Sequence, residues 1–167
     1  KDAAMNTQTI KELAKIYGPK VSVSRGKVHD YLGMDLDYTG HKNVKISMIK
    51  YLKKILVEFP EEITKTAETP AGEHLFKVAS EDMAKLLPEE QARAFHHAVA
   101  QLLFLCMRAR PDIQTAVAFL TKRVRAPDEH DWNKLRRLLK YLKGTMYMKL
   151  TLSVDNMNTI HWYVDAL

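Results

Sequence analysis

The sequence predicts an α+β fold: a small antiparallel β-meander, then a helical middle, then the start of a second β unit. Between residues 21 and 48 apolar and polar side chains alternate, which is the period of a half-buried strand. Between residues 49 and 144 apolar residues recur at spacings of three and four, which is the period of an amphipathic helix. Alternation returns after residue 145. A chain of 167 residues with 46% hydrophobic and 28% charged residues suits a globular protein.

The N-terminal part is predicted to contain one helix and three strands. Residues 3–17 carry an apolar stripe at helical spacing, and Gly18-Pro19 ends this helix. Apolar residues then alternate with polar ones in residues 21–23, 32–38 and 44–48. Three short strands in succession indicate an antiparallel meander.

The middle of the chain is predicted to be helical, with proline and glycine marking the boundaries. A helix follows from Ile49, a longer one opens at Pro88, and another begins at Pro111. Asp128 is expected to cap the last helix, and Gly144 is expected to end it.

The net charge of +6 is unevenly spread along the chain, with +5 over residues 1–60 and +7 over residues 108–149. Residues 108–149 hold 11 basic and 4 acidic residues, whereas residues 61–107 hold 4 basic and 8 acidic ones. A basic segment on folded elements indicates a polyanionic partner such as nucleic acid, although a solvated helix face would give the same pattern.

Other features limit the class of protein. No apolar stretch is long enough to span a membrane, and the N-terminus has no secretory apolar region. The single cysteine, Cys106, lies in an apolar run and is expected to pack in the core rather than to act as a nucleophile. The chain begins at Lys1 rather than at a methionine and stops after an apolar run at Leu167, so we expect a fragment of a longer protein.

Several short strings occur in the order known from one family. Tyr31-Leu32-Gly33-Met34 is similar to the "YFLGI" strand that follows the catalytic YVDD hairpin of copia-type reverse transcriptases, and Thr69-Pro70 resembles the "TPL" step. Arg110-Pro111-Asp112-Ile113 resembles "TRPDI", and Leu139-Lys140-Tyr141-Leu142-Lys143-Gly144-Thr145 resembles "LRYLKGT". The collinear order over residues 28–165 is more specific than any single string. The chain therefore resembles part of the Pol polyprotein of copia-type LTR retrotransposons.

The resemblance implies a division into four regions. Residues 1–48 resemble the end of the polymerase palm, 49–68 a thumb-like helix and loop, 69–150 the helical connection, and 151–167 the first strands of a ribonuclease H domain. The palm aspartates that hold the catalytic metal ions would precede residue 1, so the chain alone is expected to be inactive as an enzyme.

One carboxylate is a metal-ligand candidate by resemblance. Asp165 follows an aromatic-rich strand, where ribonuclease H domains place the first ligand of their Mg²⁺ ions; an ordinary strand-end aspartate is the alternative. The cofactor of the full-length parent would be Mg²⁺, and a single carboxylate cannot complete a two-metal site.

The hairpin after the catalytic strand is the primer grip in reverse transcriptases. By resemblance this role is assigned to Leu32, Gly33 and Met34. A glycine at this place would allow the close approach of a backbone, and a strand glycine at a bulge is the other interpretation.

Ten basic residues are candidates for contacts with phosphates. Lys50, Lys53 and Lys54 lie off the apolar stripe of the thumb-like helix, where a solvated face is an equally simple explanation. The others lie in the basic segment, where we favour a nucleic-acid track: Lys122, Arg123, Arg125, Arg136, Arg137, Lys140 and Lys143.

Two functions are expected from these patterns. The first is a fragment of an RNA-directed DNA polymerase with ribonuclease H, with an RNA/DNA template–primer and the rest of the Pol polyprotein as partners and no membrane. The second is a non-catalytic, domesticated nucleic-acid-binding or interaction module. A decayed insertion without function is a third possibility. The resemblance implies an intracellular protein, in cytoplasmic virus-like particles or in the nucleus.

Overall fold

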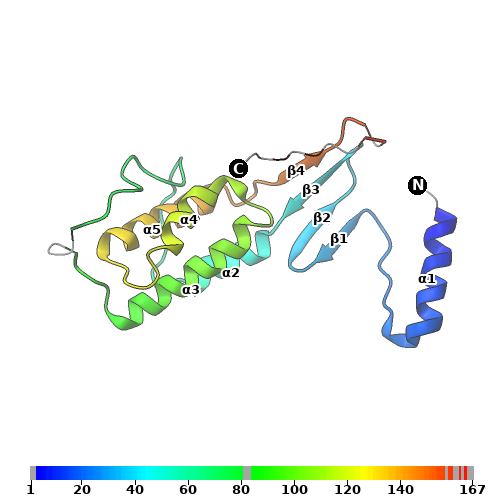
Figure 1. Ribbon diagram of the computed structural model, residues 1–167, viewed down its shortest axis with the longest axis horizontal. Coiled ribbons are helices and arrows are strands. Elements are labelled where there is room, and N and C mark those ends of the chain that lie inside the picture. The colour runs from blue at the N-terminus through cyan, green and yellow to red at the C-terminus, as the bar shows by residue number, and fades with distance from the viewer. Residues whose placement is uncertain (1–2, 81–83, 157, 160–161, 163, 165–167) are drawn as a thin grey trace.

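The computed structural model describes residues 3–80, 84–156, 158–159, 162 and 164. They form one four-stranded antiparallel sheet and five α-helices, so the fold is mixed α+β as predicted. Figure 1 shows the other helices gathered in a body at one end, the sheet beside this body, and α1 (Ala3–Tyr17) at the opposite end.

The sheet is a meander with one late addition. Strands β1 (Val28–Tyr31), β2 (Met34–Asp37) and β3 (Asn43–Ser47) follow one another, and β4 (Leu150–Ser153) pairs with the outer side of β3. The register places the apolar side chains of Leu36, Ile46 and Leu150 in one row across three strands. One face of the sheet is therefore apolar and the other polar, as period-two alternation requires.

Two details of the predicted strands are wrong. Residues 21–23 are not in a strand. Leu32, which alternates with Met34 and Leu36 in the sequence, is in the turn between β1 and β2 instead of in a strand. Alternation alone cannot distinguish the last residue before a turn from a turn residue, because both can be apolar.

The C-terminal alternation was predicted to open a second β unit, and none is seen in the described residues. Instead, β4 joins the first sheet, with Val44 opposite Leu152 and Ile46 opposite Leu150. The apolar side chains of β3 pair across the strands with those of β4, so the alternating C-terminal segment adds a fourth strand to the existing sheet. The segment predicted to open ribonuclease H therefore starts in a strand that pairs with residues 43–47, about a hundred positions earlier in the sequence.

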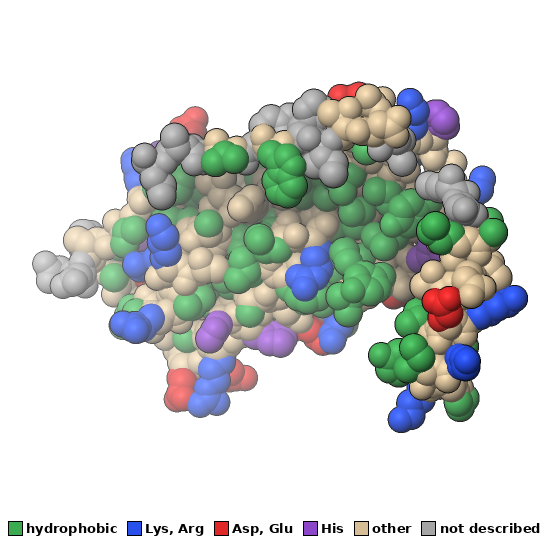
Figure 2. Space-filling model, turned by 45° about the vertical axis from the view of Figure 1, so that its right-hand side comes forward, with side chains coloured by type: hydrophobic (Ala, Val, Ile, Leu, Met, Phe, Trp, Pro, Cys, Tyr) green, Lys and Arg blue, Asp and Glu red, His purple; other side chains and the backbone are tan. Residues whose placement is uncertain are grey.

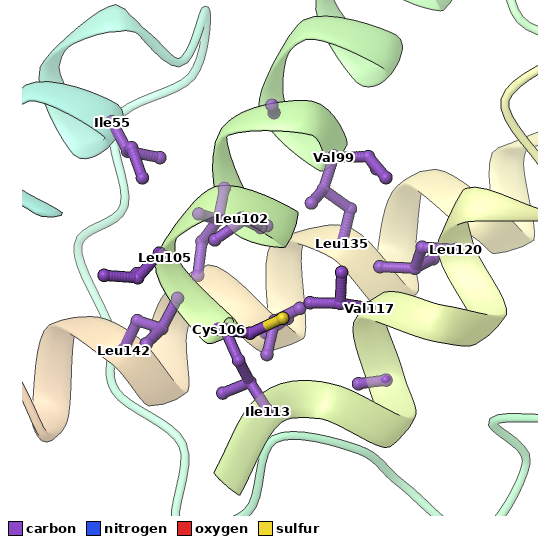
Figure 3. Close-up of a cluster of buried hydrophobic side chains, with 14 of the residues drawn as sticks. Ile55, Val99, Leu102, Leu105, Cys106, Ile113, Val117, Leu120, Leu135 and Leu142 are labelled. Atoms are coloured by element: carbon purple, nitrogen blue, oxygen red, sulfur yellow. The ribbon is translucent and has the colours of Figure 1, made fainter. Parts of the chain in front are cut away.

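The helical body contains the hydrophobic core. It consists of α2 (Ile49–Glu58), α3 (Glu89–Cys106), α4 (Gln114–Thr121) and α5 (Glu129–Gly144), and the short 3-10 helix η3 (Pro111–Ile113) leads into α4. The helices predicted from Ile49, Pro88, Pro111 and Asp128 onward are present, because each carries an apolar stripe that is buried against the others. The buried side chains converge between α3, α4 and α5, with Cys106 among them as expected (Figure 3).

The start of α5 is fixed by a capping box. The Asp128 side chain accepts a hydrogen bond from the Asp131 backbone N–H at 2.8 Å, and the Asp131 side chain accepts one from the Asp128 N–H at 3.2 Å. The prediction of Asp128 as N-cap is confirmed. Both carboxylates are buried, so the helix begins at this residue and the stripe from Trp132 to Leu142 faces the core.

The N-terminal helix stands apart from this core. The predicted helix over residues 3–17 is present, but none of its residues is buried. Figure 2 shows a hollow between α1 and the rest of the molecule, with hydrophobic side chains gathered on the body beside this hollow. Among the described residues, no helix is both long and apolar enough to cross a membrane.

Candidate nucleic-acid interface

The three primer-grip-like residues lie at a tight hairpin. Tyr31 is opposite Met34, which leaves Leu32 and Gly33 as a two-residue loop with φ angles of 51° and 78°. Two positive φ angles match the type I′ hairpin turn. A Cβ on Gly33 would meet only Met48 Cε at 3.8 Å, an ordinary contact. Neither a bulge nor close packing explains the glycine here; the left-handed backbone does.

The hairpin exposes its tip and buries its base. Leu32 is 61% exposed, whereas Met34 is half-buried and packs against the core. Leu32 and Gly33 are thus accessible to a partner molecule, and Met34 anchors the hairpin.

The polar face of the same sheet carries carboxylates. The register places Asp30 directly opposite Asp35, and Asp37 lies two residues further along β2, on the same face. Lys50 reaches both Asp30 and Asp35, at N–O distances of 3.9 and 4.0 Å. The Asp37 side chain accepts hydrogen bonds from the side chain and backbone of Thr39, and these bonds lower its pKa. Lys50 therefore offsets negative charge on the sheet.

The other two lysines of α2 differ from each other. Lys54 pairs with Glu58 one helical turn later, at 3.6 Å on an exposed surface, where such a pair contributes little to stability. Lys53 is exposed and has no bonded partner among the described residues. Of the three predicted lysines, Lys53 has the charge that is most available to a ligand.

Arg123 is held inside the structure. Its Nε lies 2.8 Å from Asp131 Oδ2, and its Nη2 lies 3.6 Å from Asp128 Oδ2. These two carboxylates form the α5 capping box, so Arg123 balances a pair of buried negative charges. Lys122 and Arg125, on either side, are exposed and have no bonded partner in the part of the chain that the structure describes.

The basic residues of α5 hold the loop of residues 60–79 against the helix. Arg136 Nε is 2.8 Å from Glu61 Oε2, Arg137 donates to the Thr69 hydroxyl at 2.9 Å, and Lys143 donates to the Ile63 carbonyl. Lys140 lies between them and has no bonded partner among the described residues. Of the three partners just named, only Glu61 is an anion. Arg137 and Lys143 bond to neutral groups, so their positive charges remain uncompensated.

Glu61 also connects α5 to the loop that follows α2. Its second carboxylate oxygen accepts a hydrogen bond from the Trp132 indole at 2.7 Å, and the Trp132 ring stacks on Phe59 with 5.0 Å between centroids. Glu61 thus holds the partly exposed Arg136 beside the buried Trp132, and so connects the predicted basic surface to the core.

A buried network joins two of the sequence strings that carry the family resemblance. The Arg110 guanidinium pairs with Asp112 at 2.7 Å and donates to the Thr145 carbonyl and hydroxyl at 3.1 and 2.6 Å. The Tyr141 hydroxyl donates to Asp112 at 2.8 Å. Arg110 and Asp112 thus form an internal ion pair, and Tyr141 and Thr145 are partners that the sequence did not reveal.

The network controls the ionisation of two of its members. Burial would raise the pKa of Asp112, but hydrogen bonds from Arg110 and Tyr141 outweigh it and hold that pKa below its ordinary value. Burial and the hydrogen bond to Asp112 raise the pKa of Tyr141. Burial likewise raises the pKa of the Cys106 thiol, which keeps it protonated and unreactive.

The metal-ligand candidate Asp165 lies outside the described residues. Among the residues that are described, no group of three or more His, Cys, Asp or Glu side chains is arranged to hold a metal ion. Asp30 and Asp35, which are opposite each other on the sheet, are bridged by Lys50 and do not fit a Mg²⁺ site.

Comparison with known proteins gives a consistent group of relatives. The chain is 29% identical over 157 residues to a transposon Ty5-1 protein of Saccharomyces cerevisiae, covering 93% of this chain and 48% of that protein. It is 27% identical to the retrovirus-related Pol polyprotein from transposon TNT 1-94 of Nicotiana tabacum, over 87% of this chain and 11% of the polyprotein. It is 37% identical to the Pol polyprotein from transposon RE2 of Arabidopsis thaliana, over 41% of this chain and 5% of that protein.

The chain therefore spans about half the length of the first of these relatives and a small part of the two polyproteins. No family model matches the chain, and no solved structure matches it. The similarity runs through nearly the whole chain in two of the three cases. The chain is thus distantly similar to the Pol polyproteins of copia-type retrotransposons.

Proposed function

We propose that this chain is the part of a retrotransposon reverse transcriptase that follows the catalytic hairpin, and that it holds the template–primer without supplying the polymerase aspartates. The observation that carries the proposal is the similarity to transposon Pol proteins across 93% and 87% of the chain. The buried network supports it, because the strings at residues 110–113 and 139–145 resemble the family and also bond to each other.

In this proposal the hairpin tip contacts the primer. Leu32 and Gly33 form an exposed two-residue turn on a base fixed by Met34, so the tip presents backbone and one apolar side chain at a defined place. Such a tip can pack against the sugar and base of a primer end without reading its sequence, as a polymerase requires.

The basic residues contact the backbone of the nucleic acid. Lys53, Lys122, Arg125 and Lys140 are the predicted cations that have no bonded partner among the described residues. Contacts from such cations to phosphates release counterions, and the affinity gained is independent of sequence. Arg123 belongs to the support of α5 rather than to this surface.

The four predicted regions remain part of the proposal. Residues 1–48 correspond to the end of the palm, 49–68 to a thumb-like unit, 69–150 to the connection, and 151–167 to the start of ribonuclease H with Asp165 as its first metal-ligand aspartate. In the parent protein Mg²⁺ would supply the chemistry at carboxylates outside the described residues. The partners would be an RNA/DNA template–primer and the rest of the polyprotein, in cytoplasmic virus-like particles or in the nucleus.

A primer-extension assay tests the proposal. The isolated 167-residue chain is expected to extend no primer, and a longer polyprotein that includes the upstream aspartates is expected to extend it in Mg²⁺. In that longer protein Leu32→Asp should weaken extension by displacing the primer end, while Asp155→Asn on an exposed site should leave it unchanged. Polymerisation by the isolated chain, or an unaffected Leu32→Asp variant, would contradict the proposal.

A second candidate is a domesticated, non-catalytic nucleic-acid-binding or interaction module. It is favoured by Lys122 and Arg125, which have no bonded partner in the described part of the chain and need no polymerase to bind a polyanion. The reading frame on either side separates the two candidates. A frame that encodes a catalytic YVDD hairpin upstream supports the polymerase, and its absence from the gene supports the module.

A further inference from the structure

Two adjoining hollows lie between α5 and the loop that precedes α3. The first has a volume of about 260 Å³ and includes Lys65, Arg136, Arg137 and Lys140 in its lining; we call it the basic hollow. The second has a volume of about 480 Å³ and includes Pro70, Leu75 and Val78; we call it the apolar hollow. Asn133 and Arg137 line both, so one ligand can occupy the two hollows together.

The basic hollow has more positive charge than its own residues neutralise. Its lining contains four cations and no carboxylate, and among the described residues the one anion that pairs with any of these cations is Glu61, at 2.8 Å from Arg136. Arg137 donates to a neutral hydroxyl, while Lys65 and Lys140 have no bonded partner among the described residues. Like charges gathered on one small surface repel one another, and an anion seated between them removes that repulsion.

The side chain of Arg137 is held in position at the junction of the hollows. Its Nη2 donates to Thr69 Oγ1 at 2.9 Å, and the Thr69 hydroxyl donates in turn to the Ala71 carbonyl at 2.9 Å. Gly72 lies against the guanidinium, since a Cβ there would be 3.8 Å from Arg137 Nε. A guanidinium fixed in this way is ready to bind a phosphate without first losing side-chain freedom.

The apolar hollow suits a flat ring. Leu75 is buried at its base, Val78 is 52% exposed at its edge, and His74 and His130 are exposed members of its lining. Imidazole rings stack on nucleobases, and the Asn133 amide can both donate to and accept from a base edge.

We propose that the two hollows form one subsite for an unpaired nucleotide of a nucleic-acid strand. Its phosphate is bound by Lys65, Arg137 and Lys140, and its base enters the apolar hollow, where stacking supplies affinity without sequence preference. This inference rests on the proposed function and adds a single-strand site to it. A base that is paired in a duplex cannot enter the hollow, so the subsite selects a single-stranded stretch of the strand.

Fluorescence anisotropy with the complete 167-residue chain tests the subsite. The probes are a labelled thymidine 20-mer, the same 20-mer annealed to its RNA complement, and a 20-mer with abasic sites. We compare the wild type with the double variant Lys65→Gln/Lys140→Gln and with the matched control Lys11→Gln/Lys15→Gln, which removes the same charge from exposed positions of α1. Thermal melting checks that both fold; neither loses a bond seen among the described residues.

The expected result is a single-strand affinity about tenfold lower for Lys65→Gln/Lys140→Gln and less than about threefold lower for the control. The abasic strand should bind the wild type about fivefold more weakly than the thymidine strand. Equal losses in the two variants, or no penalty for abasic sites, would overturn the subsite. Displacement of the strand by polyglutamate as readily as by unlabelled strand would also overturn it and indicate an acidic polypeptide ligand.

Two further outcomes separate this proposal from the one on which it rests. Binding of the annealed hybrid without binding of the single strand overturns the subsite and leaves the proposed function standing. Binding of no nucleic acid at all overturns both.

Discussion

The Arg110 guanidinium is almost fully buried, yet each of its three nitrogens donates to an oxygen. Nε and Nη2 reach Asp112, and Nη1 and Nη2 reach Thr145. A buried charge is tolerated only when its hydrogen bonds are satisfied in this way. The bonds from Arg110 to Thr145 join the start of η3 to the end of α5, 35 positions apart in the sequence. Removing Asp112 leaves the Arg110 charge buried without its ionic partner.

Arg110→Met should therefore lower the free energy of unfolding by about 1–3 kcal/mol, because the Asp112 carboxylate that loses its donors is only partly buried. The methionine fills part of the space but leaves the Asp112 carboxylate without its main donors. Urea denaturation of the 167-residue chain measures the change. Arg93→Met is the matched control, because Arg93 forms only an exposed pair with Glu89 and should cost less than about 0.5 kcal/mol. Equal effects of the two variants would contradict the role assigned to Arg110.

The same network predicts how stability depends on pH. Because the pKa of Asp112 is lower in the folded chain than in the unfolded chain, the carboxylate stabilises the fold above its unfolded pKa of about 3.9. That contribution is lost as the pH falls through the folded pKa. Melting temperatures measured between about pH 5 and pH 2 should fall less steeply for Asp112→Asn than for the wild type, although the variant starts lower. Parallel curves would show that Asp112 is not involved.

At the scale of elements, the helices followed from the sequence and the strand boundaries did not. The stripes of α2, α3 and α5 repeat over several turns, and each repeat adds evidence for the same buried face. The strands have four or five residues, so one apolar residue in a turn changes the assignment. Leu32 is such a residue. Its positive φ depends on the pairing of Tyr31 with Met34, which no local pattern reveals.

The hairpin turn gives a prediction at this scale. Leu32→Asn should stabilise the chain by several tenths of a kcal/mol, because asparagine followed by glycine favours the type I′ turn. Gly33→Val should destabilise it by about 1–2 kcal/mol, because a β-branched residue resists a φ of 78°. Urea denaturation of both variants measures these changes. A stabilising Gly33→Val would show that the turn has another conformation.

The capping box of α5 gives a second prediction for an element. Asp128→Ala should cost about 1–2 kcal/mol, because it removes the acceptor for the Asp131 N–H and one partner of Arg123. The change is measured as a shift of the urea midpoint. The control Asp155→Ala, at an exposed site, should leave the midpoint unchanged. A midpoint unaffected by Asp128→Ala would mean that α5 begins without this cap.

For the whole molecule, the sequence shows where the basic residues are concentrated, but it does not show which of them are paired with anions. The excess of basic residues over 108–149 is present in the composition. Which of these residues pair with an anion depends on contacts far along the chain: Arg136 pairs with Glu61, whereas Lys143 donates to the neutral carbonyl of Ile63, 80 positions away. Lys65, which lines the basic hollow, lies in an acidic segment and gave no signal.

The loop of residues 60–79 explains why the charge remains available. Arg137 and Lys143 bind this loop through a neutral hydroxyl and a neutral carbonyl, and so they fix its position while keeping their positive charge. Glu61 is the exception, with bonds to both Trp132 and Arg136. The helical body is thus a rigid support with a basic surface, joined to a sheet whose hairpin tip is exposed.

The central claim is that the Lys and Arg side chains of this chain bind the phosphate backbone of the template–primer, while the catalytic carboxylates belong to other parts of the parent protein. The most direct test is the affinity of the isolated 167-residue chain for a DNA primer annealed to an RNA template, measured at several salt concentrations. The account predicts a logarithm of affinity that falls linearly with the logarithm of salt concentration, with a slope set by several phosphate contacts. An affinity that does not change with salt, or no binding at low salt, would contradict it.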